Sequence, residues 1–176
     1  MPLSSFEFAS TLVGGGTSDR AVDLASVLAT FAVGDGTVWP ELATSFDLGT
    51  GDLQANQIFT DTRTVAATTN DDIDLFSGLT NVYNEAIVFT RIKWVIIDID
   101  TPTTTKRLRV GPLAVANAFV GWMINAGGTT YEEIVTRVVK EHPYAGWTVS
   151  NVIRNLRIFN PGATAVTYRI LIIGVQ

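Results

Sequence analysis

The stretch from Phe89 to Asp100, which reads FTRIKWVIIDID, constrains the fold of this chain more than any other. Successive side chains of a β-strand point to opposite faces, so an apolar run of this kind must be covered on both sides. Charged residues occur only near its two ends. We therefore expect the central strand of a two-layer β structure, covered by the C-terminal segment from Leu156 to Gly174. Its two faces would carry Ile92, Trp94 and Ile96 on one side and Val95, Ile97 and Ile99 on the other.

Further short strands follow one another with turn residues between them. Alternating side chains predict strands at residues 43–48, 57–66, 73–75, 107–110, 134–140 and 147–149. Residues 155–159 and 166–173 flank Asn160-Pro161-Gly162-Ala163 and predict a hairpin. About eight or nine strands with no fixed repeat are typical of a β-sandwich, of which the jelly roll is the commonest closed form. We therefore expect an all-β, jelly-roll-like β-sandwich.

The N-terminal part of the chain differs from the rest. Residues 1–18 contain the apolar side chains of Phe6, Phe8 and Leu12, and they end close to a run of three glycines at 14–16. We expect an extended arm with a flexible hinge at its base, able to lie along a neighbouring subunit. Residues 19–176 would form a single β-sandwich domain. Asp19 to Val33 fits both a short helix and alternating strands, and the helical pattern is favoured.

Composition bounds the possible partners. The 176 residues suit one domain, and 47% of them are hydrophobic whereas only 16% are charged. With this few charged residues, much of the protein surface must be formed by uncharged side chains. We therefore expect part of the surface to contact another protein, most simply in a homo-oligomer. The net charge of −5 argues against nucleic-acid binding, because the phosphate backbone demands a basic surface. The cations Lys106, Arg107 and Arg109 are interpreted as a solvated strand edge.

The sequence gives no indication of membrane insertion, secretion or cysteine chemistry. No run approaches the roughly 20 apolar residues that span a bilayer, and the start MPLSSFEFAS lacks the features of a secretion signal. Cysteine is absent, which removes disulfides, thiolate catalysis and cysteine zinc sites.

Catalytic material is equally scarce. His142, the only histidine, lies in the turn-like stretch EHPYAG, and no G-x-S-x-G nucleophile motif occurs. Glu132 and Glu133 are adjacent, so on a strand they would point to opposite faces and could not act as a glycosidase pair. We expect no catalytic residue and no cofactor, and hence a protein that is not an enzyme.

One acidic stretch is the best candidate for a metal site. Closely spaced oxygen ligands suit calcium, and Asn70, Asp71, Asp72 and Asp74 supply them. The stretch lacks the glycine and the later glutamate of an EF-hand, and acidic residues before a strand are usually turn formers. We therefore predict no metal site.

Tryptophan offers the clearest binding candidates. Aromatic faces stack on sugars, so Trp39, Trp94, Trp122 and Trp147 could line a carbohydrate groove. Trp94 falls in the central strand and is interpreted as packing. Trp122 and Trp147 each follow a glycine in turn-like surroundings, where an oligomer interface would explain them equally well.

The stretch from Asn56 to Asp100 also resembles a known family. Its segments IFTDTRTVAA, DDIDLFSGLTN and AIVFTRIKWVIIDI resemble a DTRTL-like strand, a DLDL-x-G-x-LTD-like turn and a TF-x-x-IK-like strand of tailed-bacteriophage structural proteins. The end, LRIFNPGATAVTYRILIIG, resembles the closing hairpin of that family. These motifs are structural and identify no active residue. The family's Pro-Gly-Gly turn is missing near Val139 to His142, and the first 40 residues have no counterpart.

This resemblance implies a jelly-roll-like virion protein of the head decoration, or cement, type. Such a protein would be a homotrimer, made in the host cytoplasm, that binds the major capsid protein on the capsid surface and needs neither nucleic acid nor membrane. The alternative is a tail or fibre module that binds host-surface carbohydrate. The interface candidates are Phe6, Phe8, Leu12, Trp122 and Trp147.

Overall fold

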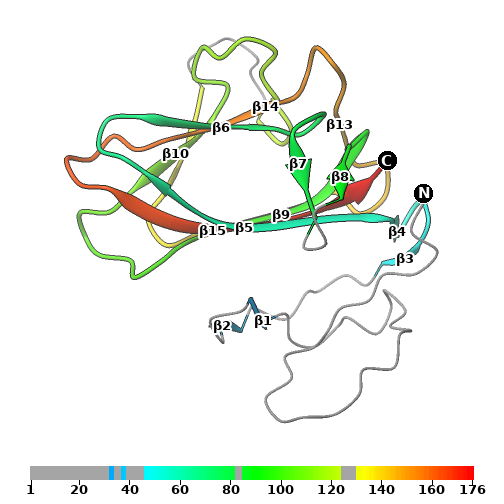
Figure 1. Ribbon diagram of the computed structural model, residues 1–176, viewed down its shortest axis with the longest axis horizontal. Coiled ribbons are helices and arrows are strands. Elements are labelled where there is room, and N and C mark those ends of the chain that lie inside the picture. Colours follow the sequence, from blue (N-terminus) through cyan, green and yellow to red (C-terminus); the bar gives the residue numbers. More distant parts are fainter. Residues whose placement is uncertain (1–31, 34–36, 39–45, 82–84, 124–129) are drawn as a thin grey trace.

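The computed structural model describes residues 46–81, 85–123 and 130–176, together with the backbone of two short strands nearer the N-terminus. Its described parts contain strands and turns but no helix, and hence no helix able to span a membrane (Figure 1). The strands are β1 (Ala32–Val33), β2 (Thr37–Val38), β3 (Asp47–Leu48), β4 (Gln54–Ala55), β5 (Gln57–Val65), β6 (Asn70–Asp74), β7 (Leu79–Thr80), β8 (Ala86–Ile87), β9 (Arg91–Ile99), β10 (Leu108–Gly111), β11 (Glu132–Ile134), β12 (Arg137–Glu141), β13 (Trp147–Thr148), β14 (Asn155–Phe159) and β15 (Val166–Val175).

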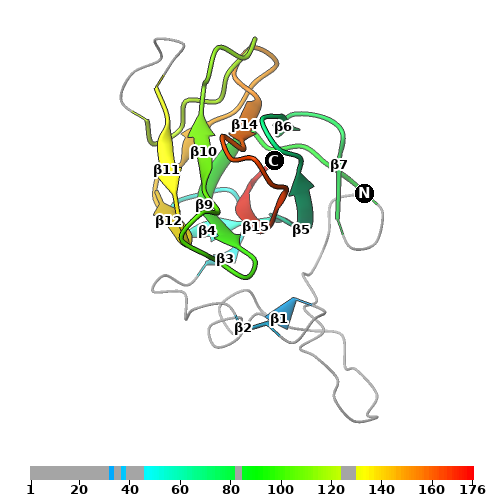
Figure 2. The ribbon, with the colours of Figure 1, turned by 90° about the vertical axis from the view of Figure 1, so that its left-hand side faces the viewer.

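Two antiparallel sheets face each other as the layers of a sandwich (Figures 1 and 2). Sheet I has the order β12-β9-β15-β5, with β13 also pairing with β9, and sheet II has the order β11-β10-β14-β6. The chain passes between the sheets at most of its turns, so strands that follow each other in sequence seldom lie side by side. This order is that of a jelly roll. The predicted all-β, jelly-roll-like β-sandwich is therefore confirmed.

The hydrophobic core lies between the two sheets, with a second, smaller cluster on the outer face of sheet I. On that outer face the ring of Phe46 packs edge-on against Trp94, with ring centroids 6.0 Å apart. Every residue of β9 after Arg91 is buried, as expected for a strand covered on both faces. Burial of each large apolar side chain stabilises the fold by about 1.5 to 3 kcal/mol, and β9 and its neighbour β15 hold more of these side chains than any other two strands of the described residues.

The predicted assignment of β9 side chains to the two faces of the sheet is wrong for Ile92. Ile92 belongs to the inter-sheet core together with Val95, whereas Trp94 belongs to the outer cluster. The cause is a β-bulge, because Gly174 of β15 is opposite Ile92 while Ile173 is opposite Trp94. Lys93 is the extra residue, and one extra residue reverses the alternation of side chains before it.

The predicted C-terminal hairpin is also wrong. β14 pairs with β10 and β6 in sheet II, whereas β15 pairs with β9 and β5 in sheet I. The turn at Asn160 therefore carries the chain from one sheet to the other. β15 is therefore a neighbour of β9 in the same sheet. Of the segment predicted to cover β9, only β14 lies in the opposite sheet. Alternation and a turn signal show that two strands are close in sequence but not that they bond to each other.

Two smaller predictions change as well. The single strand expected at 134–140 is two strands, β11 in sheet II and β12 in sheet I, separated by a bend at Val135 and Thr136. Ala32 and Val33 form β1, which pairs with β2, and not the end of a helix. The remainder of the expected helix, the strand residues 43–45 and the arm at 1–18 lie outside the described residues.

Candidate functional site

At each of the two sides of the sandwich, where the edge strands of the sheets face each other, side chains bridge the two sheets. On one side, edge strands β5 and β6 are joined by the turn at 66–69. Asp61 and Arg63 of β5 stand opposite Ile170 and Tyr168 of β15, two residues of the inter-sheet core. Both charged side chains therefore point inward. With Asp71 of β6 and Tyr168 they form a group that we call the polar seam.

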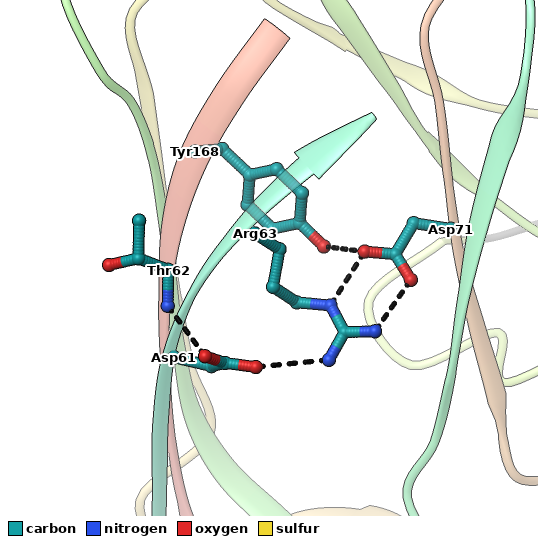
Figure 3. Close-up of polar contacts among 5 residues, drawn as sticks. All are labelled: Asp61, Thr62, Arg63, Asp71 and Tyr168. Carbon is teal, nitrogen blue, oxygen red and sulfur yellow. Dashed lines mark hydrogen bonds and ion pairs between the residues drawn. The ribbon is translucent and has the colours of Figure 1, made fainter. Parts of the chain in front are cut away.

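Hydrogen bonds tie the polar seam together across the two sheets (Figure 3). The guanidinium of Arg63 donates to both oxygens of Asp71, from Nε to Oδ2 at 2.6 Å and from Nη2 to Oδ1 at 2.8 Å. Its Nη1 donates to Asp61 Oδ2 at 3.0 Å. The hydroxyl of the buried Tyr168 donates to Asp71 Oδ2 at 2.7 Å. Asp71 thus accepts from both sheet I residues and links the layers.

Burial and pairing shift the ionisation of these groups. Burial acts to raise the pKa of Asp71, but hydrogen bonds from Arg63 and Tyr168 and the positive charge of Arg63 outweigh it, so the pKa lies below its ordinary value. The hydrogen bond to Asp71 raises the pKa of Arg63. Burial, and next the charge of Asp71, raises the pKa of Tyr168. Arg63 and Asp71 are therefore a fixed ion pair, and Tyr168 stays a neutral donor.

A surface groove of about 450 Å³ runs over the polar seam, between β5, the 66–69 turn and the start of β6. The Arg63 donors in it are already directed at carboxylates, and the tyrosine hydroxyl is held as a donor. A general base or an activated nucleophile needs an unpaired group with a matched pKa, which this arrangement does not supply. The polar seam therefore has a structural role: it links the two sheets at one side of the hydrophobic core.

The acidic stretch that formed the calcium candidate is drawn into ion pairs. Successive residues of β6 point to opposite faces, so Asp71 faces inward while Asp72 faces outward and makes two 2.6 Å bonds with Arg157. Asp74 accepts from the backbone of Phe76 and Ser77, each at 3.0 Å. Among the described residues, no three acidic, histidine or cysteine side chains gather as metal ligands. Asn70 pairs through its backbone with Phe159.

The other open side, between β11 and the β12/β13 edge, is closed by aromatic rings. Trp122 and Trp147 pack edge to face with ring centroids 5.5 Å apart. Phe119 lies 6.2 Å from Trp122, and His142 lies 5.6 Å from Trp147, both also edge to face. We call these four residues the aromatic seam. The structure thus brings together the two tryptophans that the sequence suggested as interface candidates.

Polar contacts and two glycines fix the aromatic seam in place. Trp122 Nε1 donates to Glu132 at 2.9 Å, and the other carboxylate oxygen of Glu132 lies 2.8 Å from Lys140 Nζ. Glu132 of β11 thereby links sheet II to β12 of sheet I. Gly121 and Gly146, which precede the two tryptophans, have φ values of 42° and 73°. These left-handed conformations favour glycine, and they bend the chain so that the tryptophan ring that follows points toward the other rings of the aromatic seam.

The ring geometry of the aromatic seam favours packing over sugar binding. A flat carbohydrate platform requires two rings in nearly one plane, but the angles between neighbouring rings are 70°, 63° and 83°. Trp122 and Trp147 are both half-buried and pack against the inter-sheet core. A sugar ring could therefore stack on at most one of them. Trp94 packs in the outer cluster, so its predicted packing role is confirmed, and Trp39 lies outside the described residues.

The remaining sequence candidates that fall within the described residues have structural partners. Glu132 and Glu133 point to opposite faces as predicted, since Glu133 lies 3.3 Å from Arg107 and 3.5 Å from Arg109. Arg109 also stacks over the Tyr131 ring at 4.4 Å. Phe6, Phe8 and Leu12 lie outside the described residues, so their predicted contacts stay predictions.

Sequence reasoning missed the buried cation of the central strand. Lys93, the bulged residue of β9, is fully buried, and its ammonium donates to the backbone carbonyls of Gly51, Pro143 and Tyr144. Burial lowers the pKa of Lys93, and the nearby charge of Arg91 adds to the effect. Through these bonds one side chain fastens the 49–53 turn and the β12–β13 loop to the central strand. A lysine inside an otherwise apolar run is the signal that could have identified it.

Comparison with known proteins finds similar solved structures but no similar family or curated sequence. No known protein family and no curated protein sequence matches the chain. Among solved structures, the Yersinia pseudotuberculosis-derived mitogen aligns with 67% of this chain and 86% of its own, at 14% identity and a TM-score of 0.35. A chain of the cyanophage Pam1 capsid asymmetric unit aligns with 76% of this chain and 92% of its own, at 16% identity and a TM-score of 0.31. At these TM-scores neither similarity bears on function.

Proposed function

We propose that this chain is a virion structural protein of a tailed bacteriophage that decorates the head and stabilises the capsid by binding across capsomers. The observation that carries the proposal is an agreement between sequence and fold. Motifs that resemble a phage structural family imply a jelly roll, and the strands have the jelly-roll order. A fold alone assigns no function, so the motifs carry the choice of a virion role.

The chemistry of the described residues suits a protein that acts by surface contact, without catalysis. Both open sides of the sandwich are filled by bridging groups, and the charged side chains of the polar seam are already paired. The low charge content of 16% leaves an outside suited to association. In this proposal the protein is a homotrimer on the capsid surface, and its partner is the major capsid protein. Several weak contacts per trimer would add up through avidity.

Heads that lack this protein provide the direct test. Purified protein is added to such heads at increasing concentration, and the temperature at which the heads release DNA is measured. The proposal predicts saturable binding and a higher release temperature. Failure to bind heads that lack it would contradict the proposal.

The carbohydrate-binding alternative is tested in the same material. Trp122→Ala and Trp147→Ala would weaken binding to host cells or host glycans if either ring stacks on sugar, while binding to heads stayed unchanged. The twisted arrangement of the rings favours the opposite result, in which glycan binding is absent from the wild-type protein. Glycan binding that either substitution abolishes would move the protein to the tail or fibre.

A further inference from the structure

The outer face of sheet I, which is turned away from sheet II, is more deeply buried than a two-layer sandwich requires. One face of an antiparallel sheet usually packs on the core while the other meets water. Ile96 of β9 and Leu171 of β15 lie opposite each other on this outer face, yet they are 0% and 1% exposed. Further chain must therefore cover the middle of the face.

Charged residues beside this apolar pair are buried as well. Asp98 and Arg169 lie opposite each other, two residues away along the same strands, and are 7% and 8% exposed. Arg169 Nη2 donates to Asp98 Oδ2 at 2.7 Å, and Arg137 Nε donates to Asp98 Oδ1 at 3.0 Å. Even a paired aspartate and arginine would stay accessible to water on the outside of a sheet unless further chain covered them. The cover therefore extends beyond the apolar pair to these charges.

The described residues cover only one end of this face. Among them, Phe46 and Ala55 are the only members of the outer cluster that come from outside sheet I, and the Phe46 ring packs against Trp94. Asp98 lies four residues beyond Trp94, which is about 13 Å along the strand. A ring that packs against Trp94 therefore leaves Asp98 and Arg169 to be covered by another segment.

The chain before Phe46 is the segment best placed to supply this cover. Phe46 itself lies on the outer face, so the residues that precede it start from that face. Figures 1 and 2 both show the backbone of β1 and β2 on the outer side of sheet I, away from sheet II. A segment that is joined to the surface it binds has a high effective concentration there, which favours the chain's own residues over those of a second copy.

The composition of residues 19–45 matches the face. Fourteen of these 27 residues are hydrophobic, as needed to cover Ile96 and Leu171. The segment has a net charge of −3, because it has four carboxylates and one cation. These are Asp19, Asp23, Asp35 and Glu41, with Arg20 as the cation. The charged group on sheet I has the opposite sign, with Arg137 and Arg169 on either side of one aspartate, so the charges of segment and face are complementary.

We propose that residues 19–45 dock on the outer face of sheet I of the same chain and form a third layer of the domain. Apolar side chains of the segment would cover Ile96 and Leu171, and its carboxylates would lie near Arg137 and Arg169. This docking would leave residues 1–18 as the part of the N-terminus that can reach a partner. The proposal does not rest on the proposed virion function.

Cross-linking tests the docking in the full-length protein, which contains no cysteine of its own. Thr60→Cys places one thiol opposite Leu171 on the outer face of sheet I. A second cysteine replaces each of five alanines in turn, namely Ala21, Ala25, Ala29, Ala32 and Ala43. With a short bismaleimide, the best pair should give at least about tenfold more intramolecular cross-link than the same scan against Arg109→Cys on the outer face of sheet II. Mass spectrometry separates intramolecular from intermolecular products.

Thiol reactivity gives a second measurement on the same chain. The hydroxyl of Thr60 is buried, whereas Thr64 on the same face of β5 is exposed. Leu24→Asp together with Leu28→Asp places charges in the apolar part of the segment. This double substitution should raise the rate at which Thr60→Cys reacts with a thiol reagent at least about fivefold, and leave the rate of Thr64→Cys unchanged. Leu12→Asp, in the predicted arm, is the matched control and should change neither rate.

The outcomes separate the possible occupants of the face. Intermolecular cross-links alone would show that the segment comes from a second copy. An unchanged rate of Thr60→Cys in the double variant would show that another segment covers the face. Either result, or no cross-link above the Arg109→Cys scan from any of the five positions, would overturn the proposal.

Discussion

At the scale of single residues, the main feature is the pairing of inward-pointing charges. Asp61 and Arg63 occupy positions of β5 that lie between the core residues Phe59 and Val65. A buried charge without a partner is costly, and Asp71 together with Tyr168 supplies the partners from both sheets. The contact between the two sheets at the polar seam therefore depends on the carboxylate of Asp71.

Asp71→Asn should destabilise the protein by about 2 to 3 kcal/mol, because it removes the charge that compensates Arg63 and weakens the acceptor of Tyr168. The matched control is Asp72→Asn on the same strand, whose ion pair with Arg157 is more exposed and should contribute about 1 kcal/mol or less. Denaturant unfolding measures both. Equal losses for the two variants would show that the seam has no special role.

The effect of Asp71 should also depend on pH. The pKa of its carboxyl in the folded protein lies below the ordinary value of 3.8, so the folded state favours the ionised form. Its stabilising contribution is full above the unfolded pKa and is lost as the pH falls through the folded pKa. The difference in unfolding free energy between wild type and Asp71→Asn should be constant near neutral pH and shrink below about pH 4. A difference that grows on acidification would contradict this assignment.

Lys93→Met should loosen two loops at once, because it removes the hydrogen bonds from the ammonium to three backbone carbonyls of those loops. The carbonyls of Gly51 and Pro143 keep backbone donors from Gln54 and Leu53, so we expect a loss of about 1 to 2 kcal/mol. Hydrogen exchange should rise in the 49–53 turn and the β12–β13 loop and stay unchanged in β14. Unchanged exchange in both loops would show that other contacts hold them.

At the scale of elements, the sequence predicts which strands exist better than it predicts their partners. β9 and β15 were expected from their apolar, β-branched residues, and both are buried. Their pairing could not be predicted, since alternation indicates which face of a strand is buried and carries no information about its neighbour. The bulge at Lys93 was hidden because it is visible only in the register with Gly174.

The candidate sites show the same limit. Trp122 and Trp147 could be selected from their type and the preceding glycines, and the structure brings them together. The polar seam was missed because Arg63 and Asp71 come from different sheets and are joined only by the fold. Charged residues at the inward positions of a strand would have been the available signal.

The turn before β13 gives a prediction about one element. Gly146 has a φ of 73°, and an added Cβ would lie 3.0 Å from the carbonyl oxygen of Ile92. Gly146→Ala should cost about 1 to 2 kcal/mol through backbone strain and crowding, and should change the fluorescence of Trp147. Gly78→Ala is the control, because its φ of 86° is similar but nothing lies within 4 Å of the added atom. A Gly146→Ala loss no larger than that of the control would exclude crowding.

At the scale of the whole molecule, a sandwich closed on both sides is suited to act as a rigid body, and the predicted arm at residues 1–18 is not needed to close it. Deletion of residues 1–18 should therefore leave the thermal unfolding of the purified domain unchanged within a few degrees. The same deletion should abolish the protection of heads against heat, if the predicted arm makes the capsid contact. Calorimetry on the protein and a heat-release assay on heads separate the two effects. Full protection by the truncated protein would show that the arm is not used.

The copy number of this protein in purified virions distinguishes a head decoration protein from a minor virion component. Quantitative mass spectrometry gives its ratio to the major capsid protein. A decoration protein that binds across capsomers must occupy lattice sites, so we expect a ratio of the same order as one copy per capsid subunit. A handful of copies per particle would exclude head decoration and place the protein in the tail or at a single vertex.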